Sequence, residues 1–445
     1  MYLQKIHIEN YRLLTNIDIF LDRVLTLIVG KNNTGKTSVI NLIRKVLNEE
    51  KTLSIDDYPL ECRSRLYDVI EKYWAGEIDQ SEVKQQIAET SISFYIDYSE
   101  EDDDQPLGSL SPFIIDIDDN NTSARIDAIY TFDELKADEM FSSCKGRYDQ
   151  LLQARQKDNP GDEGQEGFDR ALTAAVVKDS FDKFFYLKVL AVEDCQEKPS
   201  SLLRKLFTYR TIEAERNLDE SENKNDHPLA GMMNRVFNPE EQELESAFSP
   251  IISELNRYVD DVGFSAQERI DALMNQIIAG MIHFGYPSAE DLKLKASSNI
   301  SLKNQIMSNT DLMYTSSDGG ESLPSTHNGL GYKNLIKISL ILTEFSRAVV
   351  ANATTIPLLL IEEPEAHMHP QLQSTFVGFV SKFLKESIGA GRHLQTILSS
   401  HSSHVANTVD FKQVRYMRRT TNGVNCKDLQ HFYQEGQTDE QKENL

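Results

Sequence analysis

Residues 2–21 alternate between apolar and polar positions, which predicts two β-strands joined near Asn10-Tyr11-Arg12. The apolar members of this pattern are Tyr2, Leu3, Ile6, Ile8, Leu13, Leu14, Ile17, Ile19 and Leu21. A continuous apolar run rich in β-branched residues follows at 24–29 and predicts a buried strand. Apolar residues at helical spacing from Val39 to Val46 then predict a helix that ends near Glu50. The chain therefore opens as a β-rich segment that leads into a strand and a helix.

The following segment mixes helices and strands. Amphipathic spacing predicts helices over 52–90 and over most of 133–190, where the second is interrupted by a loop of Asp, Asn, Pro and Gly at 158–164. Alternating or apolar stretches predict strands at residues 91–98, 124–132 and 184–192. The acidic run 100–104 is typical of a solvated loop rather than of a metal site.

In the second half of the chain, the hydrophobic pattern changes from helical to strand-like. Residues 227–282 have a helical pattern with no catalytic spacing, and 292–316 alternate as if strands returned to the core sheet. Further strands are predicted at 356–363, at 395–401 and in a closing pair at 415–419 and 424–426. These patterns predict an α/β fold divided into residues 1–225, a largely helical insertion at 226–290 that is a candidate dimerisation arm, and residues 291–445.

The turn after the strand at 24–29 carries a phosphate-binding motif. Gly30 and Gly35-Lys36-Thr37 have the spacing of a Walker A loop, and the loop lies between a strand and a helix, as its mechanism requires. The glycines let backbone N–H groups face a phosphate, and the helix N-terminus adds partial positive charge. Lys36 is expected to reach the β- and γ-phosphates and the Thr37 hydroxyl to bind Mg²⁺. The residues predicted to bind nucleotide here are Gly30, Asn32, Asn33, Thr34, Gly35, Lys36, Thr37 and Ser38.

Residues from three further segments complete a candidate ATPase site. The apolar strand at 356–363 ends in Glu362 and Glu363; the first is expected to bind Mg²⁺ and the second to polarise a water in line with the γ-phosphate. His401 directly follows a predicted strand and is expected to contact the γ-phosphate. Glycines at the start of a predicted helix also favour an anion, which adds Asn328, Gly329 and Gly331 as nucleotide-binding candidates.

The composition of the chain indicates which broad class of protein it belongs to. The chain has 445 residues, 40% of them hydrophobic, which is enough for a sizeable core. No apolar run approaches the ~20 residues of a membrane span, no signal peptide is evident, and the four cysteines are widely spaced, so we expect a cytoplasmic protein with reduced thiols. A net charge of −24 argues against a chain coated in DNA-binding surface, although it leaves room for a local basic groove.

The order of these motifs resembles the ABC-type ATPase domain of the OLD (overcoming lysogenization defect) family and its RecF- and SMC-like relatives. The resemblance rests on Ile8-Glu9-Asn10-Tyr11-Arg12, on the Walker A loop, on the run Glu362-Glu363-Pro364-Glu365-Ala366-His367 with His369-Pro370, and on Ser399-Ser400-His401. It implies a P-loop head that binds ATP and Mg²⁺ and closes as a homodimer, with Walker A of one subunit facing the Asn328 to Lys333 signature of the other. The chain departs from the general pattern because this signature lacks Ser-Gly-Gly-Gln.

Full-length OLD proteins continue into a Toprim nuclease domain. The segment after His401 holds no apolar strand that ends in an Asp-x-Asp pair, so we expect no nuclease site in this chain. The resemblance therefore implies a partner nuclease or other effector, either in a C-terminal part of a longer protein or as a separate chain.

Three functions remain open from the sequence. The first is a dimerising or higher-order ATPase that regulates a nuclease or toxic effector in phage defence. The second is a RecF-like DNA-repair ATPase that binds DNA in an ATP-dependent way, which would need a basic surface. The third is a scaffold held together by ATP, in which hydrolysis is incidental.

Overall fold

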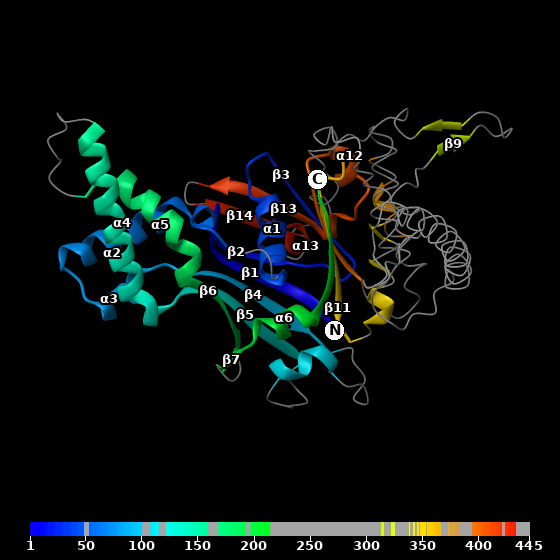
Figure 1. Cartoon of the computed structure of the whole chain (residues 1–445). Helices are drawn as coiled ribbons and strands as arrows, with labels where there is room; N and C mark the ends of the chain where they lie inside the picture. Colours follow the sequence, from blue (N-terminus) through cyan, green and yellow to red (C-terminus); the bar gives the residue numbers. More distant parts are fainter. Residues whose placement is uncertain are drawn as a thin grey trace, which may run out of the picture. The chain divides into compact units, whose positions relative to one another are not determined.

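The computed structural model divides the chain into two compact units, residues 1–215 with 352–445, and residues 216–351. The residues it describes are 1–48, 53–99, 107–114, 122–158, 168–192, 196–213, 354–365, 394–420 and 423–432, with short pieces of 313–352 and 373–382. Among the described residues, the first unit contains two six-stranded sheets (Figure 1). All of the catalytic candidates belong to it.

One of these sheets is antiparallel, in the order β2-β1-β4-β5-β6-β7. Its strands are β1 (Tyr2–Tyr11), β2 (Leu14–Phe20), β4 (Thr90–Asp97), β5 (Ser123–Phe132), β6 (Phe185–Ala191) and β7 (Gln196–Lys198). Along β1, Ile6 and Ile8 are buried whereas Lys5 and His7 are half-buried, so the alternation read from the sequence corresponds to a core face and an outer face.

The other sheet is mixed, in the order β14-β13-β3-β12-β11-β8. Its strands are β3 (Leu25–Gly30), β8 (Phe207–Ile212), β11 (Ile356–Glu362), β12 (Gln395–Ser400), β13 (Val414–Thr420) and β14 (Gly423–Asp428). All neighbouring pairs from β13 to β8 are parallel, and only the edge pair β13–β14 is antiparallel. Strands β11 and β12 are buried along their whole length, as expected for parallel strands covered on both faces.

The helices of the first unit whose bounds the structure describes are α1 (Lys36–Leu47), α2 (Leu60–Ala75), α3 (Gln80–Gln86), α4 (Ala137–Asp158), α5 (Arg170–Phe184), α6 (Ser200–Leu206), α12 (Ser403–Ala406) and α13 (Leu429–Phe432). Short 3₁₀ helices occur at Ile55–Asp57, Gly108–Phe113, Glu134–Lys136 and Phe411–Gln413.

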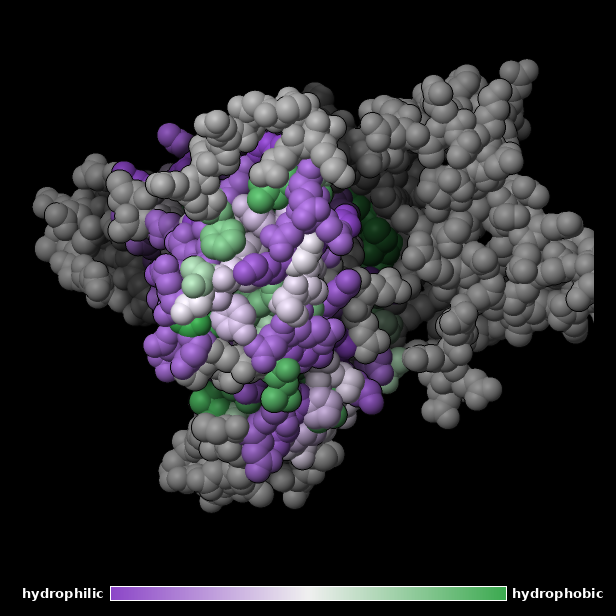
Figure 2. Space-filling model, turned by 60° about the vertical axis from the view of Figure 1, so that its left-hand side comes forward, coloured by the Kyte–Doolittle hydropathy of each residue, from purple (hydrophilic) through white to green (hydrophobic). Residues whose placement is uncertain are grey.

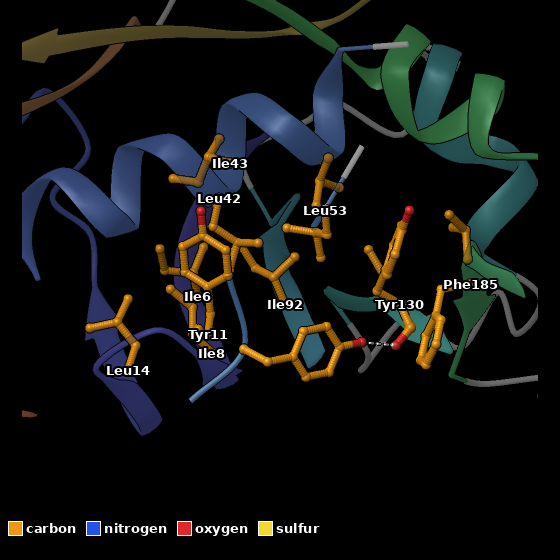
Figure 3. Packing of buried hydrophobic residues seen from close by; sticks show 14 of the residues in the cluster. Ile6, Ile8, Tyr11, Leu14, Leu42, Ile43, Leu53, Ile92, Tyr130 and Phe185 are labelled. Atoms are coloured by element: carbon orange, nitrogen blue, oxygen red, sulfur yellow. Dashed lines mark hydrogen bonds between the residues drawn. The ribbon is translucent and has the colours of Figure 1, made fainter. Parts of the chain in front are cut away.

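Helix α1 packs in the centre of this unit. It contacts β3, β11 and β12 of the mixed sheet. Figure 3 shows Leu42 of the same helix directed toward Tyr11 of β1. The apolar residues of both sheets and of α1 form one continuous core cluster. Because α1 packs against both sheets, the apolar stripe along the helix is wide. The packing of α1 in the core also fixes the position of the P-loop that precedes it.

The sequence predicted most of these elements correctly, and the α/β class with mixed strands and a P-loop helix is confirmed. One expectation is wrong. The strand around Tyr314, β9 (Met313–Thr315), does not return to a core sheet, because it pairs with the nearby β10 (Ser322–Pro324) in a two-stranded sheet of the second unit. The acidic run 100–104 and the helical insertion 226–290 lie outside the described residues, so the insertion stays a prediction.

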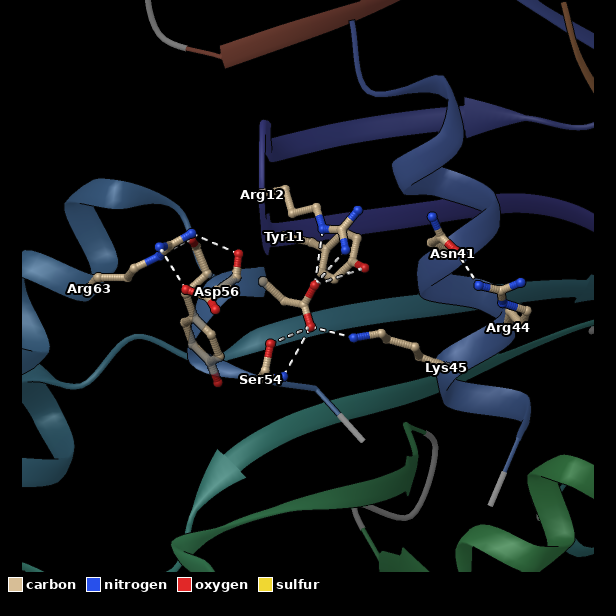
Figure 4. A network of polar contacts seen from close by, with 10 residues as sticks. Tyr11, Arg12, Asn41, Arg44, Lys45, Ser54, Asp56 and Arg63 are labelled. Atoms are coloured by element: carbon tan, nitrogen blue, oxygen red, sulfur yellow. Dashed lines mark hydrogen bonds and ion pairs between the residues drawn. The ribbon is translucent and has the colours of Figure 1, made fainter. Parts of the chain in front are cut away.

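A buried carboxylate joins α1 to the turn between β1 and β2. The side chain of Asp57 is only 3% exposed, and its Oδ1 accepts from Arg12 Nε at 3.0 Å and Nη2 at 2.9 Å. Its Oδ2 accepts from Lys45 in the last turn of α1 and from the Ser54 backbone N–H. Figure 4 shows Arg12, Lys45 and Ser54 approaching from three separate segments. Burial alone would raise the pKa of Asp57, but the hydrogen bonds from Lys45 and Ser54 outweigh it and hold the pKa below the ordinary value.

Substitution Asp57→Asn should destabilise the protein at pH 7 by about 1–3 kcal/mol, because the partly exposed cations Arg12 and Lys45 lose the buried carboxylate that they share. Since the folded pKa of Asp57 is depressed, its contribution is present above the unfolded pKa and is lost as the pH falls through the folded pKa. The stability gap between parent and variant should therefore close below about pH 4 in urea titrations. Asp56→Asn is the matched control, because Asp56 pairs with Arg63 while 53% exposed and should matter by less than about 1 kcal/mol. An equal effect of both substitutions would contradict this assignment.

The surface is largely polar on the face shown in Figure 2, where the hydrophobic residues are scattered among hydrophilic ones. Within the part of the chain that the structure describes, no helix has both the length and the apolar character needed to span a bilayer.

Candidate functional site

The candidate residues gather at one edge of the mixed sheet because three parallel strands end there. β12 pairs with β3 on one side and with β11 on the other, all in the same direction. The P-loop follows β3, Glu362 is the last residue of β11 and Glu363 follows it, and His401 follows β12. Parallel strands place their carboxyl ends at a common edge, so residues far apart in sequence become neighbours.

The P-loop backbone has the conformation that an anion site needs. Asn33 (φ 60°) and Gly35 (φ 87°) both have left-handed backbones, a feature of the concave loops whose N–H groups can bind an anion. Gly35 caps α1 without any side-chain hydrogen bond, and the first turn of α1 carries no acidic residue. The first N–H groups and the positive end of the α1 dipole are therefore available to a phosphate. The Thr34 hydroxyl donates to the Lys31 carbonyl at 2.8 Å, and this hydrogen bond within the loop stabilises its conformation.

Gly30 has no room for a side chain. A Cβ at this position would lie 2.5 Å from the Met417 carbonyl oxygen of β13 and 2.8 Å from Thr34 Oγ1. We expect Gly30→Ala to shift the loop and to weaken ATP binding roughly 10- to 100-fold, which corresponds to the ~1–3 kcal/mol strain of overpacking. Isothermal titration with ATP measures this effect.

The matched control is Gly146→Ala in α4, where a Cβ would meet nothing within 4 Å. This change should leave binding intact and stabilise the helix by about 0.5–1 kcal/mol. Parent-like ATP affinity in Gly30→Ala would show that the loop tolerates a Cβ.

Lys36, His401 and Glu363 form one hydrogen-bonded chain. Lys36 Nζ donates to the carbonyl oxygens of Gly30 and Lys31, each at 2.9 Å, and lies 3.2 Å from His401 Nδ1. Because an ammonium only donates, His401 Nδ1 must be the acceptor and is unprotonated. His401 Nε2 then carries the hydrogen and donates to Glu363 Oε1 at 2.6 Å. The contacts thus assign a neutral imidazole between a cation and a carboxylate.

Lys36 is almost fully buried, at 3% exposure. Burial lowers its pKa below the ordinary lysine value, while the nearby charges of Glu363 and Glu365 act in the opposite direction. Besides His401 Nδ1, its present partners are two carbonyls of its own loop, which a phosphate oxygen can replace. The ammonium is therefore held next to the loop that would bind phosphate.

Glu363 has a left-handed backbone, with φ 40°. Such a conformation costs a non-glycine residue about 1–3 kcal/mol and persists only where neighbours hold it. Here the Glu363 N–H donates to the Ser399 carbonyl of β12 at 2.9 Å. The strained turn directs the Glu363 carboxylate toward His401 at the end of the neighbouring strand.

A magnesium ion would find suitable ligands in Glu362 and Thr37. The Glu362 side chain is buried at the very end of β11, and Thr37 lies in the first turn of α1. Carboxylate and hydroxyl oxygens suit Mg²⁺, which commonly takes one or two protein ligands and completes its shell with phosphate oxygens and water. These residues therefore fit the ion that the P-loop chemistry requires.

Of the residues predicted from the sequence, the structure brings Gly30, Lys36, Glu363 and His401 into hydrogen-bonded contact, with Gly35 in the same loop. Their role in binding ATP stays a prediction. Asn32 and Asn33 are exposed on the outer side of the loop, Thr37 is half-buried, and Ser38 is buried in α1. The signature candidates Asn328, Gly329 and Gly331 lie outside the described residues.

One residue of the site was not predicted. Glu365 Oε1 accepts from the His401 backbone N–H at 2.6 Å and from Ser400 Oγ at 2.8 Å. The sequence contained it only as part of the Glu-Glu-Pro-Glu run, and nothing in that run indicates a bond to a backbone N–H 36 residues later.

Comparison with known proteins finds one matching family model and several similar proteins. A family model described as "AAA ATPase domain" matches residues 1–406. The protein named endonuclease GajA from Bacillus cereus (strain HuB5-5) is 24% identical over 415 residues, which is 91% of this chain and 56% of that protein. The chain thus spans little more than half the length of this relative.

Among solved structures, the SMC head domain from Thermotoga maritima is similar with a TM-score of 0.38 and 11% identity, covering 96% of this chain and 99% of the other. An SMC head solved with the C-terminal winged-helix domain of ScpA has a TM-score of 0.40 and 9% identity, covering 96% and 98%. With the family model matching from residue 1 to residue 406, the protein belongs to the AAA ATPase domain family.

Proposed function

We propose that this chain binds and hydrolyses ATP with Mg²⁺ at the edge of the mixed sheet. The observation that carries the proposal is the chain of contacts from Lys36 through His401 to Glu363. It connects a phosphate-binding cation to a carboxylate through an imidazole, directly beside a helix N-terminus. Membership of the AAA ATPase domain family supports the same chemistry.

Each residue then has a defined role. Lys36 and the first N–H groups of α1 bind the phosphates, with Thr37 and Glu362 holding the metal. Bound Mg²⁺ supplies charge neutralisation at the phosphate oxygens. Glu363 accepts the proton of the attacking water, and His401 holds Glu363 Oε1 through its Nε2–H. When Lys36 exchanges its contact with His401 Nδ1 for a phosphate oxygen, that nitrogen becomes free to accept a hydrogen bond near the γ-phosphate.

We further propose that two copies close over ATP, with Walker A of one subunit facing the Asn328 to Lys333 segment of the other. The support is the resemblance of the motifs to the OLD family and its RecF- and SMC-like relatives. Closure over two nucleotides would exclude water and complete the site.

The closed dimer is proposed to regulate a nuclease or other effector in anti-phage defence, as the OLD resemblance implies. A relative is named as an endonuclease, and this chain covers only 56% of its length. The effector would then lie in a further part of the protein or in a separate chain.

The test combines phosphate release with mass in solution. Mg²⁺-dependent release of phosphate from ATP, lost on chelation, would support hydrolysis. A doubling of mass by light scattering when Mg-ATP is added to Glu363→Gln would support closure. Absence of phosphate release would contradict the ATPase proposal, and a mass independent of nucleotide would contradict ATP-driven dimerisation. Sheared DNA added in a parallel arm would detect ATP-dependent binding to DNA.

A further inference from the structure

Glu365 joins the loop after β11 to the end of β12 through its side chain. The last backbone pair between these strands is Glu362 with Ser399. Beyond that pair, Glu365 Oε1 accepts from the His401 backbone N–H at 2.6 Å and from Ser400 Oγ at 2.8 Å. The carboxylate therefore continues the connection of the two strands past the point where the backbone ladder ends.

Hydrogen bonds of Ser402 also hold the segment that follows β12. The Ser402 N–H donates to Ser400 Oγ at 3.0 Å, and the Ser402 hydroxyl donates to Gln373 Oε1 at 2.6 Å. Ser402 also caps α12, which begins one residue later. Ser400 and His401 thus lie between the Ser402 cap and the side chain of Glu365. The Glu365 carboxylate is the anionic acceptor of these hydrogen bonds.

His401 is the residue on which this arrangement acts. Its backbone N–H is bound by Glu365, while its ring reaches Lys36 on one side and Glu363 on the other. An anionic acceptor makes a stronger hydrogen bond to a backbone N–H than a neutral one does. Fixing the backbone of His401 therefore fixes where both ring nitrogens lie.

We propose that Glu365 is a positioning residue of the ATPase site, which holds the His401 backbone so that the imidazole bridges Lys36 and Glu363. This inference rests on the proposed function, because it assigns His401 a role in hydrolysis. Without the carboxylate, the His401 N–H and the Ser400 hydroxyl lose their acceptor. The His401 ring is then no longer held in position to donate to Glu363. A misplacement of about 1 Å in a catalytic group can cost roughly 100-fold in rate.

The kinetic test uses two substitutions at this position. Glu365→Ala should lower kcat by roughly 10- to 100-fold while the Kd for ATP stays within about threefold of the parent. Glu365→Gln keeps a carbonyl oxygen that can accept both hydrogen bonds, so it should recover most of the rate. Glu61→Gln, at an exposed position of α2, controls for the loss of one carboxylate.

A double-variant cycle separates positioning from a general loss of structure. If Glu365 acts through His401, Glu365→Ala should slow the His401→Ala protein little further. Additive losses would overturn the proposal, because they would show that Glu365 acts independently of His401. Failure of Glu365→Gln to improve on Glu365→Ala would also overturn it, since the acceptor would then not be the important feature.

Hydrogen exchange measures the same contact without any catalysis. We expect the peptide that contains Ser400 and His401 to exchange at least about tenfold faster in Glu365→Ala than in the parent, with P-loop peptides unchanged. Unchanged exchange would overturn the proposal whatever the rates are. If the parent protein released no phosphate but the exchange result held, the proposed ATPase function would fail while the structural contact of Glu365 with His401 stood.

Discussion

Replacing Lys36 by alanine should lower ATP affinity by at least about 100-fold and abolish hydrolysis. Charge-assisted hydrogen bonds contribute about 1.5–3 kcal/mol each, and the ammonium is expected to contact two phosphates, so a loss of about 3–6 kcal/mol follows. Lys36 already lies inside the P-loop, with its ammonium 2.9 Å from two loop carbonyls. Isothermal titration with ATP and phosphate release measure the two effects.

Lys31→Ala is the matched control, because Lys31 belongs to the same loop but its side chain is exposed. It should bind ATP within about threefold of the parent, since an exposed charge adds little. Thermal unfolding must show that Lys36→Ala is folded, because that substitution also removes the donors to Gly30 and Lys31. A folded Lys36→Ala protein that binds ATP like the parent would remove Lys36 from the site.

Glu363→Gln should bind ATP with near-parent affinity and hydrolyse it roughly 10²- to 10⁴-fold more slowly, the usual contribution of a positioned general base. The amide keeps the size of the side chain and an oxygen that can accept from His401 Nε2, which lies 2.6 Å from Glu363 Oε1 in the parent. It loses only the ability to take the proton of water. Single-turnover phosphate release separates the chemical step from nucleotide binding.

The same substitution at the exposed Glu61 should leave both steps unchanged. Hydrolysis by Glu363→Gln at the parent rate would show that Glu363 is not the base. A Glu363→Gln protein that assembled and functioned normally would instead favour a scaffold in which hydrolysis is incidental.

Local pattern was sufficient for most elements of the fold. The alternation around Ile6 and Ile8, the apolar run before Gly30 and the helical spacing after Val39 each reflect which side of an element is buried. Strand β8 was not predicted, although Phe207–Ile212 forms the edge of the mixed sheet beside β11. Its residues are mostly half-buried, which gives neither a clear alternation nor a continuous apolar run.

Some residues of the candidate site could be predicted from the sequence and others could not. The P-loop is a local structure, so its spacing alone indicated Gly30, Gly35 and Lys36. The role of Glu365 depends on a hydrogen bond across 36 residues, and no local pattern encodes such a contact. The buried network of Asp57 with Arg12 and Lys45 was missed for the same reason.

The sequence by itself determined the chemistry available to this protein, namely a phosphate loop, two carboxylates after a buried strand and a histidine after another. Only the tertiary structure decided how these groups meet. The order of parallel strands places β12 between β3 and β11, so His401 reaches Lys36 on one side and Glu363 on the other. The physical reason is that motifs depend on bonds between near neighbours in the chain, whereas sheet order depends on burial and hydrogen bonding across the whole core.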